Sequence, residues 1–132
     1  MSLSIRKAGV HDILAVYHLV LSATQRGKIL KRSKTEIQNS VHHFWVAEER
    51  GMVIACCALE IYNKKLAEIR SLAVDSRWEK QGIASRLVEA CLKESRKKRI
   101  YEVLVITNRE HIFKRHGFSE QLHDQKALFI RP

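Results

Sequence analysis

The sequence predicts an α/β domain built around one mixed β-sheet. Apolar residues recur at helical spacing in some segments, whereas other segments are nearly continuous apolar runs of strand length. Three strand-like runs joined by short turns lie mid-chain, which favours antiparallel pairing there. A strand, loop, helix and strand then follow, and this crossover places two strands parallel. The expected order along the chain is β-α-α-β-β-β-α-β-α-β, without an internal repeat.

The N-terminal part is expected to contain a strand and two helices. A short strand covers residues 4–7, and a helix covers residues 11–25. Ser33 and Glu36 form a capping-box pattern that begins a second helix, which ends near His43. The apolar stripe of the first helix is Ile13, Tyr17, Val20 and Leu21.

The middle and C-terminal parts supply the remaining strands. Strands are expected over residues 44–48, 52–59 and 67–74, and the second is apolar enough to be buried on both faces. A polar loop, residues 75–81, leads into a long helix that ends in the basic run 96–99. The later elements are a strand over residues 100–106, a short helix over 110–116 and a final strand over 127–130.

Length and composition favour a single domain over residues 1–132. The chain is 45% hydrophobic, its one proline is Pro132, and no Gly-, Ser- or Pro-rich stretch offers a linker. No apolar run reaches the about 18 residues that a membrane span needs, and no signal peptide is recognisable, so we expect a cytoplasmic protein without membrane contact. The cysteines, Cys56, Cys57 and Cys91, are expected in the core rather than in disulfides.

The charge of the chain indicates an anionic ligand or partner. Lys and Arg number 24 against 14 Asp and Glu, a net charge of +10. Nucleic acid, a phosphate-bearing cofactor and a dicarboxylate substrate all remain open on this ground. A metal site is not expected, because His42 and His43 are adjacent and His111 and His116 are five residues apart, so neither pair shares a helix face.

The segment with the most chemical information runs from residue 72 to residue 87. A buried strand enters a loop, and Gly82 and Ala84 fall at the first turn of the next helix, where backbone N–H groups are free to bind an anion. Ser85 adds a hydroxyl. Taken alone, one glycine at a helix start favours an ordinary tight turn over an anion site.

Residues 74–87 resemble the acetyl-CoA-binding motif of the GNAT superfamily of N-acetyltransferases. Gln81, Gly82 and Ala84 fit the motif, whereas Glu79 stands where it usually has Arg or Gln. Residues 113–118 resemble the family's closing motif. The resemblance implies the GNAT acyl-CoA N-acyltransferase fold and an enzyme that transfers the acetyl group of acetyl-CoA to an amine. The cofactor-binding residues it implies are Leu72, Ala73, Val74, Lys80, Gln81, Gly82, Ile83, Ala84, Ser85, Asn108 and Phe113.

A closer resemblance is to the acetyltransferase domain of N-acetylglutamate synthases. Residues 27–33, 55–59 and 107–108 are similar to that domain in order and spacing. The resemblance implies a small, anionic amine acceptor such as glutamate. Lys replaces Arg at Lys31 and offers a point charge where Arg would bind a carboxylate bidentately, so glutamate specificity stays open. The acceptor-binding residues it implies are Lys31, Arg32, Lys65, Ile69 and Ser71.

Glu68 is the expected general base, acting on the amine through water. The alternative for Glu68 is a surface acid paired with Lys65 or Arg70. Many GNAT enzymes protonate the leaving thiolate with a tyrosine at the position of Phe113, so the sequence offers no general acid. For Asn108, capping of the short helix that follows is an equal alternative to a place at the mouth of the cleft.

Two other functions remain open. The domain could be a non-catalytic GNAT-like module that binds RNA or an acidic protein, or it could acetylate a protein or a polyamine. The second usually needs an acidic pocket, and the sequence places few acids near the expected cleft besides Glu68 and Glu79. The family also often pairs through its C-terminal strands, which allows a homodimer.

Overall fold

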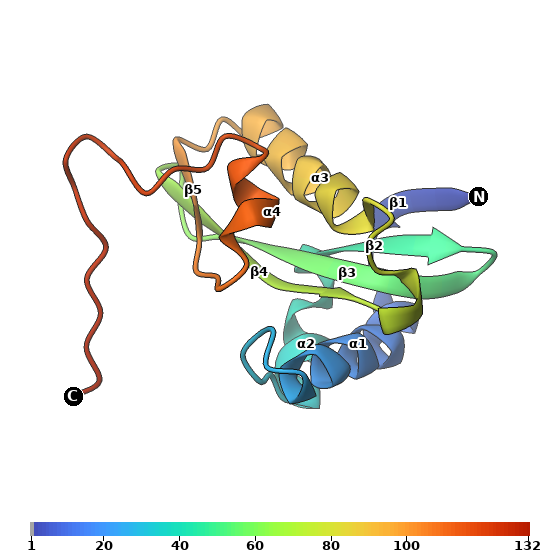
Figure 1. The fold of residues 1–132 in the computed structure, drawn as a ribbon. Coiled ribbons are helices and arrows are strands. Elements are labelled where there is room, and N and C mark those ends of the chain that lie inside the picture. Colours follow the sequence, from blue (N-terminus) through green and yellow to red (C-terminus); the bar gives the residue numbers. More distant parts are fainter. Residues whose placement is uncertain (1) are drawn as a thin grey trace.

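The computed structural model describes residues 2–132 and has five strands in one sheet with helices on both faces (Figure 1). Neighbouring strands follow chain order. The first three pairs are antiparallel, and the last, β4 with β5, is parallel. The strands are β1 (Leu3–Lys7), β2 (Phe44–Glu49), β3 (Met52–Ile61), β4 (Leu66–Val74) and β5 (Glu102–Val105).

Two helices cover each face of the sheet. The helices α1 and α2 lie on one face, and α3 and α4 lie on the other (Figure 1). The capping box at Ser33 is confirmed, because its hydroxyl accepts from the Glu36 N–H while the Glu36 carboxylate accepts from the Ser33 N–H, both at 3.1 Å. The helices are α1 (Ile13–Gln25), α2 (Lys34–Ser40), α3 (Ile83–Lys97) and α4 (Glu110–Lys114).

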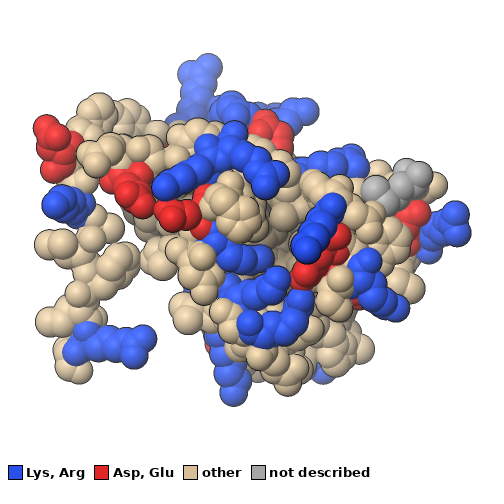
Figure 2. All heavy atoms as spheres, viewed as in Figure 1, with Lys and Arg blue, Asp and Glu red and all other residues tan. Residues whose placement is uncertain are grey.

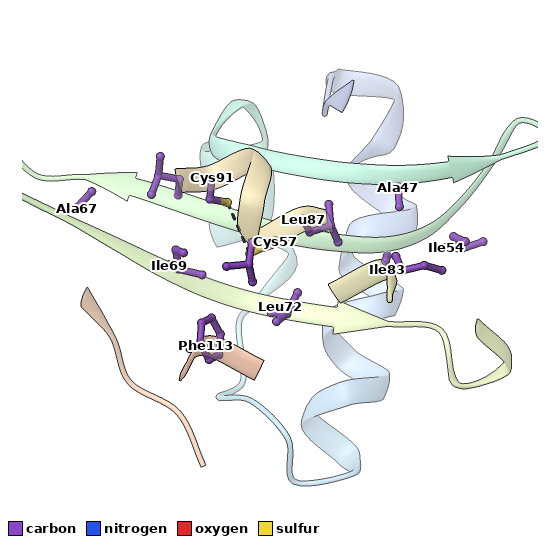
Figure 3. Packing of buried hydrophobic residues seen from close by; sticks show 13 residues of the cluster. Ala47, Ile54, Cys57, Ala67, Ile69, Leu72, Ile83, Leu87, Cys91 and Phe113 are labelled. Carbon is purple, nitrogen blue, oxygen red and sulfur yellow. Dashed lines mark hydrogen bonds between the residues drawn. The ribbon is translucent and has the colours of Figure 1, made fainter. Parts of the chain in front are cut away.

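The sheet separates two apolar clusters, and β3 contributes to both. Successive side chains of a strand point to opposite faces, so Cys56 and Ala58 pack towards α1, whereas Cys57 and Leu59 pack towards α3. Figure 3 shows the α3-side cluster, to which β3, β4, α3 and Phe113 contribute. The expected burial of this strand on both faces is therefore confirmed.

The final strand expected over residues 127–130 is wrong. This segment has no strand pairing, and Leu128 and Ile130 are 87% and 86% exposed. After α4 the chain leads away from β5, as the red end of the ribbon in Figure 1 shows, so its alternating apolar residues find no strand to pair with. The predicted order therefore loses its last strand.

Three element boundaries also differ from the sequence prediction. The second helix ends at Ser40 and continues as a 3-10 turn, Val41–His43. The last strand and the last helix are shorter than expected and cover only Glu102–Val105 and Glu110–Lys114. None of the helices in the described part of the chain has the length and apolar composition that crossing a bilayer requires.

An irregularity in β4 shapes the functional end of the sheet. The register between β3 and β4 shifts between Cys56 and Ala58, where β4 carries one extra residue. Ser71 lies in this bulge with a φ of +56°. Pairing of β4 with β5 ends at Ile69 and Val105, although β4 continues to Val74. The last residues of β4 therefore have an open edge.

Leu87→Ala should lower the free energy of unfolding by about 2 to 5 kcal/mol, because the side chain is fully buried between α3 and the sheet. Leu128→Ala is the matched control and should change it by less than about 0.5 kcal/mol. Urea unfolding measures both. A large loss in the Leu128 variant would contradict the exposed C-terminal segment.

Candidate active site

A cleft of about 700 Å³ opens where β4 and β5 separate. Its walls come from the second half of β4, the segment after β5, the start of α4 and the loop that follows α1. It brings together seven residues that the sequence placed in the site, and Figure 2 shows Lys and Arg side chains gathered around a hollow on this face. Five of them lie in β4 and in the loop after α1, namely Arg32, Glu68, Ile69, Ser71 and Leu72, and the other two are Asn108 and Phe113.

Two arginine side chains occupy the open edge of β4. Arg109 donates through Nη2 to the Leu72 carbonyl oxygen at 3.0 Å, and Arg26 donates through Nη2 to the Val74 carbonyl oxygen at 3.2 Å. These are the two backbones that the sequence analysis assigned to the cofactor. Because β5 has already diverged, their carbonyls accept from side chains instead of from a strand.

The glycine loop forms an open cradle at the start of α3. Gly82 precedes the first turn of the helix with a φ of +79°, which L-residues rarely adopt. A Cβ at this position would meet no heavy atom within 4 Å, so the surface above the glycine is free. Lys80 and Gln81 are exposed beside it, whereas the Ile83 side chain is buried in the core. The unpaired N–H groups of the first turn remain available to an anion.

Ser85 is engaged outside the cleft. Its Oγ lies 2.8 Å from His116 Nε2, and His116 Nδ1 lies 3.5 Å from a Glu89 oxygen. None of the three residues lines the cleft. The hydroxyl thus connects α3 to the segment after α4, and at the cradle Ser85 contributes its backbone.

Glu79, which departs from the motif, binds two cations from the end of α1. Its Oε1 accepts from Arg26 Nη1 at 2.6 Å and from Lys28 Nζ at 3.2 Å. The hydrogen bond from Arg26 is the main cause that holds the pKa of Glu79 below its usual value. Positive charge is therefore present beside the glycine loop. Arg26 and Lys28, which follow α1, supply it, whereas the motif usually supplies it from the loop itself.

Arg32 is a buried cation in the wall of the cleft. Its guanidinium donates to Ser71 Oγ at 3.2 Å, to Ser40 Oγ at 3.3 Å and to Glu60 Oε1 at 3.4 Å, while its Nε has no partner. Lys31 and Lys65 are exposed and lie outside the lining.

Glu68 is half-buried and lines the cleft from β4. One of its oxygens accepts from Tyr62 Oη at 2.5 Å, and this bond is the main cause of the raised pKa of Tyr62. Among the described residues Glu68 forms no ion pair with Lys65 or Arg70, and the carboxylate nearest Arg70 is that of Glu60, at 4.0 Å. The surface ion pair considered as the alternative for Glu68 is not formed.

Asn108 and Phe113 lie on the opposite wall. Asn108 Nδ2 donates to the Gly27 carbonyl at 3.5 Å, and α4 has no side-chain cap, so the capping alternative for Asn108 is not formed. Phe113 is buried and packs edge-to-face on Phe118.

The sequence analysis missed three cations that line the cleft. Lys28, Arg70 and Arg109 join Arg32, against Glu68 as the one acid among the described lining residues. The cleft is therefore positively charged and suits anionic ligands.

Residues 40–120 match the acetyltransferase (GNAT) domain family. The chain belongs to this family. It is 38% identical over 116 residues to an uncharacterized N-acetyltransferase of Chlorobaculum tepidum, covering 88% of this chain and 75% of the relative. It is 36% identical over 120 residues to an amino-acid acetyltransferase of Mycobacterium tuberculosis, and the match covers 88% of this chain and 68% of the relative. The GNAT resemblance and the fold class are confirmed.

Solved structures of GNAT proteins share the fold. Rv2747 of Mycobacterium tuberculosis, crystallised with CoA, superposes with a TM-score of 0.83 and 32% identity over 88% of this chain and 71% of that one. The N-acetylglutamate synthase of Neisseria gonorrhoeae, crystallised with coenzyme A and L-arginine, superposes with a TM-score of 0.79 and 26% identity. The match covers 96% of this chain and 29% of that one.

Arg32→Ala should lower the free energy of unfolding by about 3 kcal/mol, because it leaves the Glu60 carboxylate and two hydroxyls without their buried partner. Lys31→Ala, one residue earlier and exposed, should change it by less than about 0.5 kcal/mol. Denaturant titrations of the two variants measure the difference. Equal stabilities would show that the Arg32 network does not hold the loop after α1.

Proposed function

We propose that this GNAT domain transfers the acetyl group of acetyl-CoA to the primary amine of a small anionic acceptor, an amino acid such as glutamate. The observation that carries the proposal is the cleft itself, where an open strand edge meets four cations and one carboxylate. The glycine cradle lies outside the cleft lining, in the loop that follows the same strand. Relatives named amino-acid acetyltransferase and a structural neighbour crystallised with CoA support the same reaction.

The residues present fit acetyl-CoA. The space above Gly82 and the N–H groups of Ile83, Ala84 and Ser85 suit a pyrophosphate, with Lys80 and Gln81 beside them. The Leu72 and Val74 carbonyls each accept from one arginine and have a second lone pair that suits an amide donor, and Ala73 lies between them. Asn108 and Phe113 form the far wall. When bound, acetyl-CoA supplies the activated acyl group at the open edge of β4.

Arginine side chains suit the carboxylates of the acceptor. Arg32 is held rigidly by Ser71 and Ser40, and Arg70 has only a long contact with Glu60. Guanidinium groups bind carboxylates bidentately, which gives both affinity and orientation. Ile69 contributes an apolar surface nearby. Lys31 and Lys65 lie outside the lining of the cleft. Arg32 and Arg70 are therefore the residues proposed to bind the carboxylates of the acceptor.

Glu68 is positioned to take the proton from the amine. An amine attacks a thioester only when it is deprotonated, and a carboxylate in the same cleft removes that proton directly or through water. The Tyr62 hydroxyl holds one oxygen of Glu68, which fixes the orientation of the carboxylate without neutralising it.

Glu68→Gln should lower kcat about a hundredfold, because the amide keeps the shape of the side chain but accepts no proton. The affinity for acetyl-CoA should not change. Steady-state thiol release and calorimetry measure the two quantities. Tyr62→Phe serves as the control, since it keeps the carboxylate and should cost less than about tenfold. Unchanged turnover in the Glu68 variant would remove it as the base.

Gly82→Ala should weaken acetyl-CoA binding about tenfold or more, because the new Cβ lies in the cradle. Gly51→Ala is the matched control, with the same φ of +79° and the same empty surroundings but in the β2–β3 turn. Both variants should lose about 1 kcal/mol of stability. Equal affinities for acetyl-CoA would place the cofactor elsewhere.

Arg70→Gln should raise the KM for the acceptor about tenfold or more and leave the affinity for acetyl-CoA unchanged, because a charged hydrogen bond to a carboxylate is lost. The assay is thiol release from acetyl-CoA with a panel of free amino acids and polyamines. Turnover on glutamate or aspartate supports the proposal. Turnover on polyamines alone, or none across the panel, would contradict the anionic acceptor.

A further inference from the structure

Arg109 lies in the cleft as a desolvated cation. It is half-buried, with one N–H on the Leu72 carbonyl oxygen at 3.0 Å and a buried Nε that has no hydrogen-bond partner. No carboxylate among the described residues forms an ion pair with it. Burial accordingly lowers the pKa of its guanidinium from the ordinary value. A charge that is removed from water without a partner costs stability, and such groups concentrate where a ligand supplies the missing partner.

The other arginines at this cleft all have carboxylate partners. Arg26 pairs with Glu79 at 2.6 Å, Arg32 with Glu60 at 3.4 Å, and Arg70 approaches Glu60 to 4.0 Å. Arg109 therefore differs from them in that no carboxylate of the described residues lies within ion-pair distance of it.

Apolar side chains flank Arg109 in the cleft. Leu72, Val105 and Phe113 line the same end of the cleft and are apolar. His, Cys and Tyr are absent from the described residues that line the cleft. Negative charge that develops at this end is thus met by a fixed guanidinium in an apolar setting, where an ionic interaction is stronger than in water.

We propose that Arg109 holds the thiolate of coenzyme A as an ion pair when the acetyl group leaves it. The inference rests on the proposed function, which brings the thioester to the open edge of β4. The amine nitrogen bonds to the carbonyl carbon, the carbon–sulfur bond breaks, and its electron pair stays on sulfur. The proton from nitrogen goes to Glu68 and then to solvent, and the thiolate takes a proton from water after release.

The chemistry of the guanidinium suits this role. Arginine does not give up its proton near neutral pH, so it stabilises the thiolate without protonating it. One of its N–H groups is fixed by Leu72, which anchors the side chain, and the unpartnered Nε–H is available to sulfur. The charge is present before the reaction begins and needs no rearrangement.

The test is the pKa of the coenzyme A thiol when bound, read from the ultraviolet absorbance of the thiolate as pH is raised. In the wild type it should lie at least about one unit below that of free coenzyme A, because an adjacent cation stabilises the thiolate. Arg109→Gln should return it to the free value and lower kcat about a hundredfold. Arg109→Lys should keep part of the shift.

Two further variants serve as controls, one for the thiol pKa and one for the folding of the Arg109 variants. Arg77→Gln removes an exposed arginine that pairs with Asp75 outside the cleft and should leave the thiol pKa unchanged. Arg109→Met should fold with at least wild-type stability, because it removes an unpaired buried charge.

Three results would overturn the assignment. A bound thiol that titrates as in free coenzyme A, or one that is shifted equally in Arg109→Gln, excludes the thiolate contact. A raised acceptor KM with an unchanged thiol pKa would make Arg109 a carboxylate-binding residue instead. If the wild type binds no coenzyme A at all, the proposed function fails and the assignment fails with it.

Discussion

The parallel pairing between β4 and β5 ends early, and the rest of the site depends on that ending. The two strands are joined only as far as Ile69 and Val105, while β4 continues to Val74 beyond the bulge at Ser71. A continuous ladder would bury the Leu72 and Val74 carbonyls in strand pairing. Because the strands separate, the structure gains a cleft with backbone groups on one wall and α4 on the other. The glycine loop follows in the chain from the same strand, after the 3-10 turn Ser76–Trp78.

Electrostatics then determine what that surface accepts. Most of the charged side chains that line the cleft are cationic. The acids near them have different partners. Glu60 pairs with Arg32 and Glu79 pairs with Arg26, whereas Glu68 accepts a hydrogen bond from Tyr62 and forms no ion pair among the described residues. Arg109 alone among the cleft arginines is left without a carboxylate. The family membership explains why acyl transfer occurs at this fold, and the distribution of charge is the basis for proposing an anionic acceptor.

Most of the fold followed from the sequence, because the apolar spacing of α3, the continuous apolar run of β3 and the capping box at Ser33 are local patterns. The strand expected over residues 127–130 failed because its pattern contained no information about a pairing partner. In the site, the motif placed Gly82 just before α3, and strand position placed Glu68 where it lines the cleft, while the roles of both residues stay predictions. Arg109 was missed because its importance comes from desolvation and from a missing partner, both of which arise only when β4, β5 and α4 meet. For the same reason, the sequence could not show that Glu79 would find Arg26 fifty-three residues away.

The most direct test of this account is amide hydrogen exchange with and without coenzyme A. The open edge of β4 and the first turn of α3 form the proposed binding site of the cofactor. Exchange of the backbone amide hydrogens should therefore slow over residues 70–75 and 82–86 when coenzyme A binds. A second hollow of about 600 Å³ lies along the outer edge of β5, lined by Leu66, Val103 and Phe118, and offers an internal comparison. Protection confined to that hollow, or no protection at the end of β4, would contradict the account.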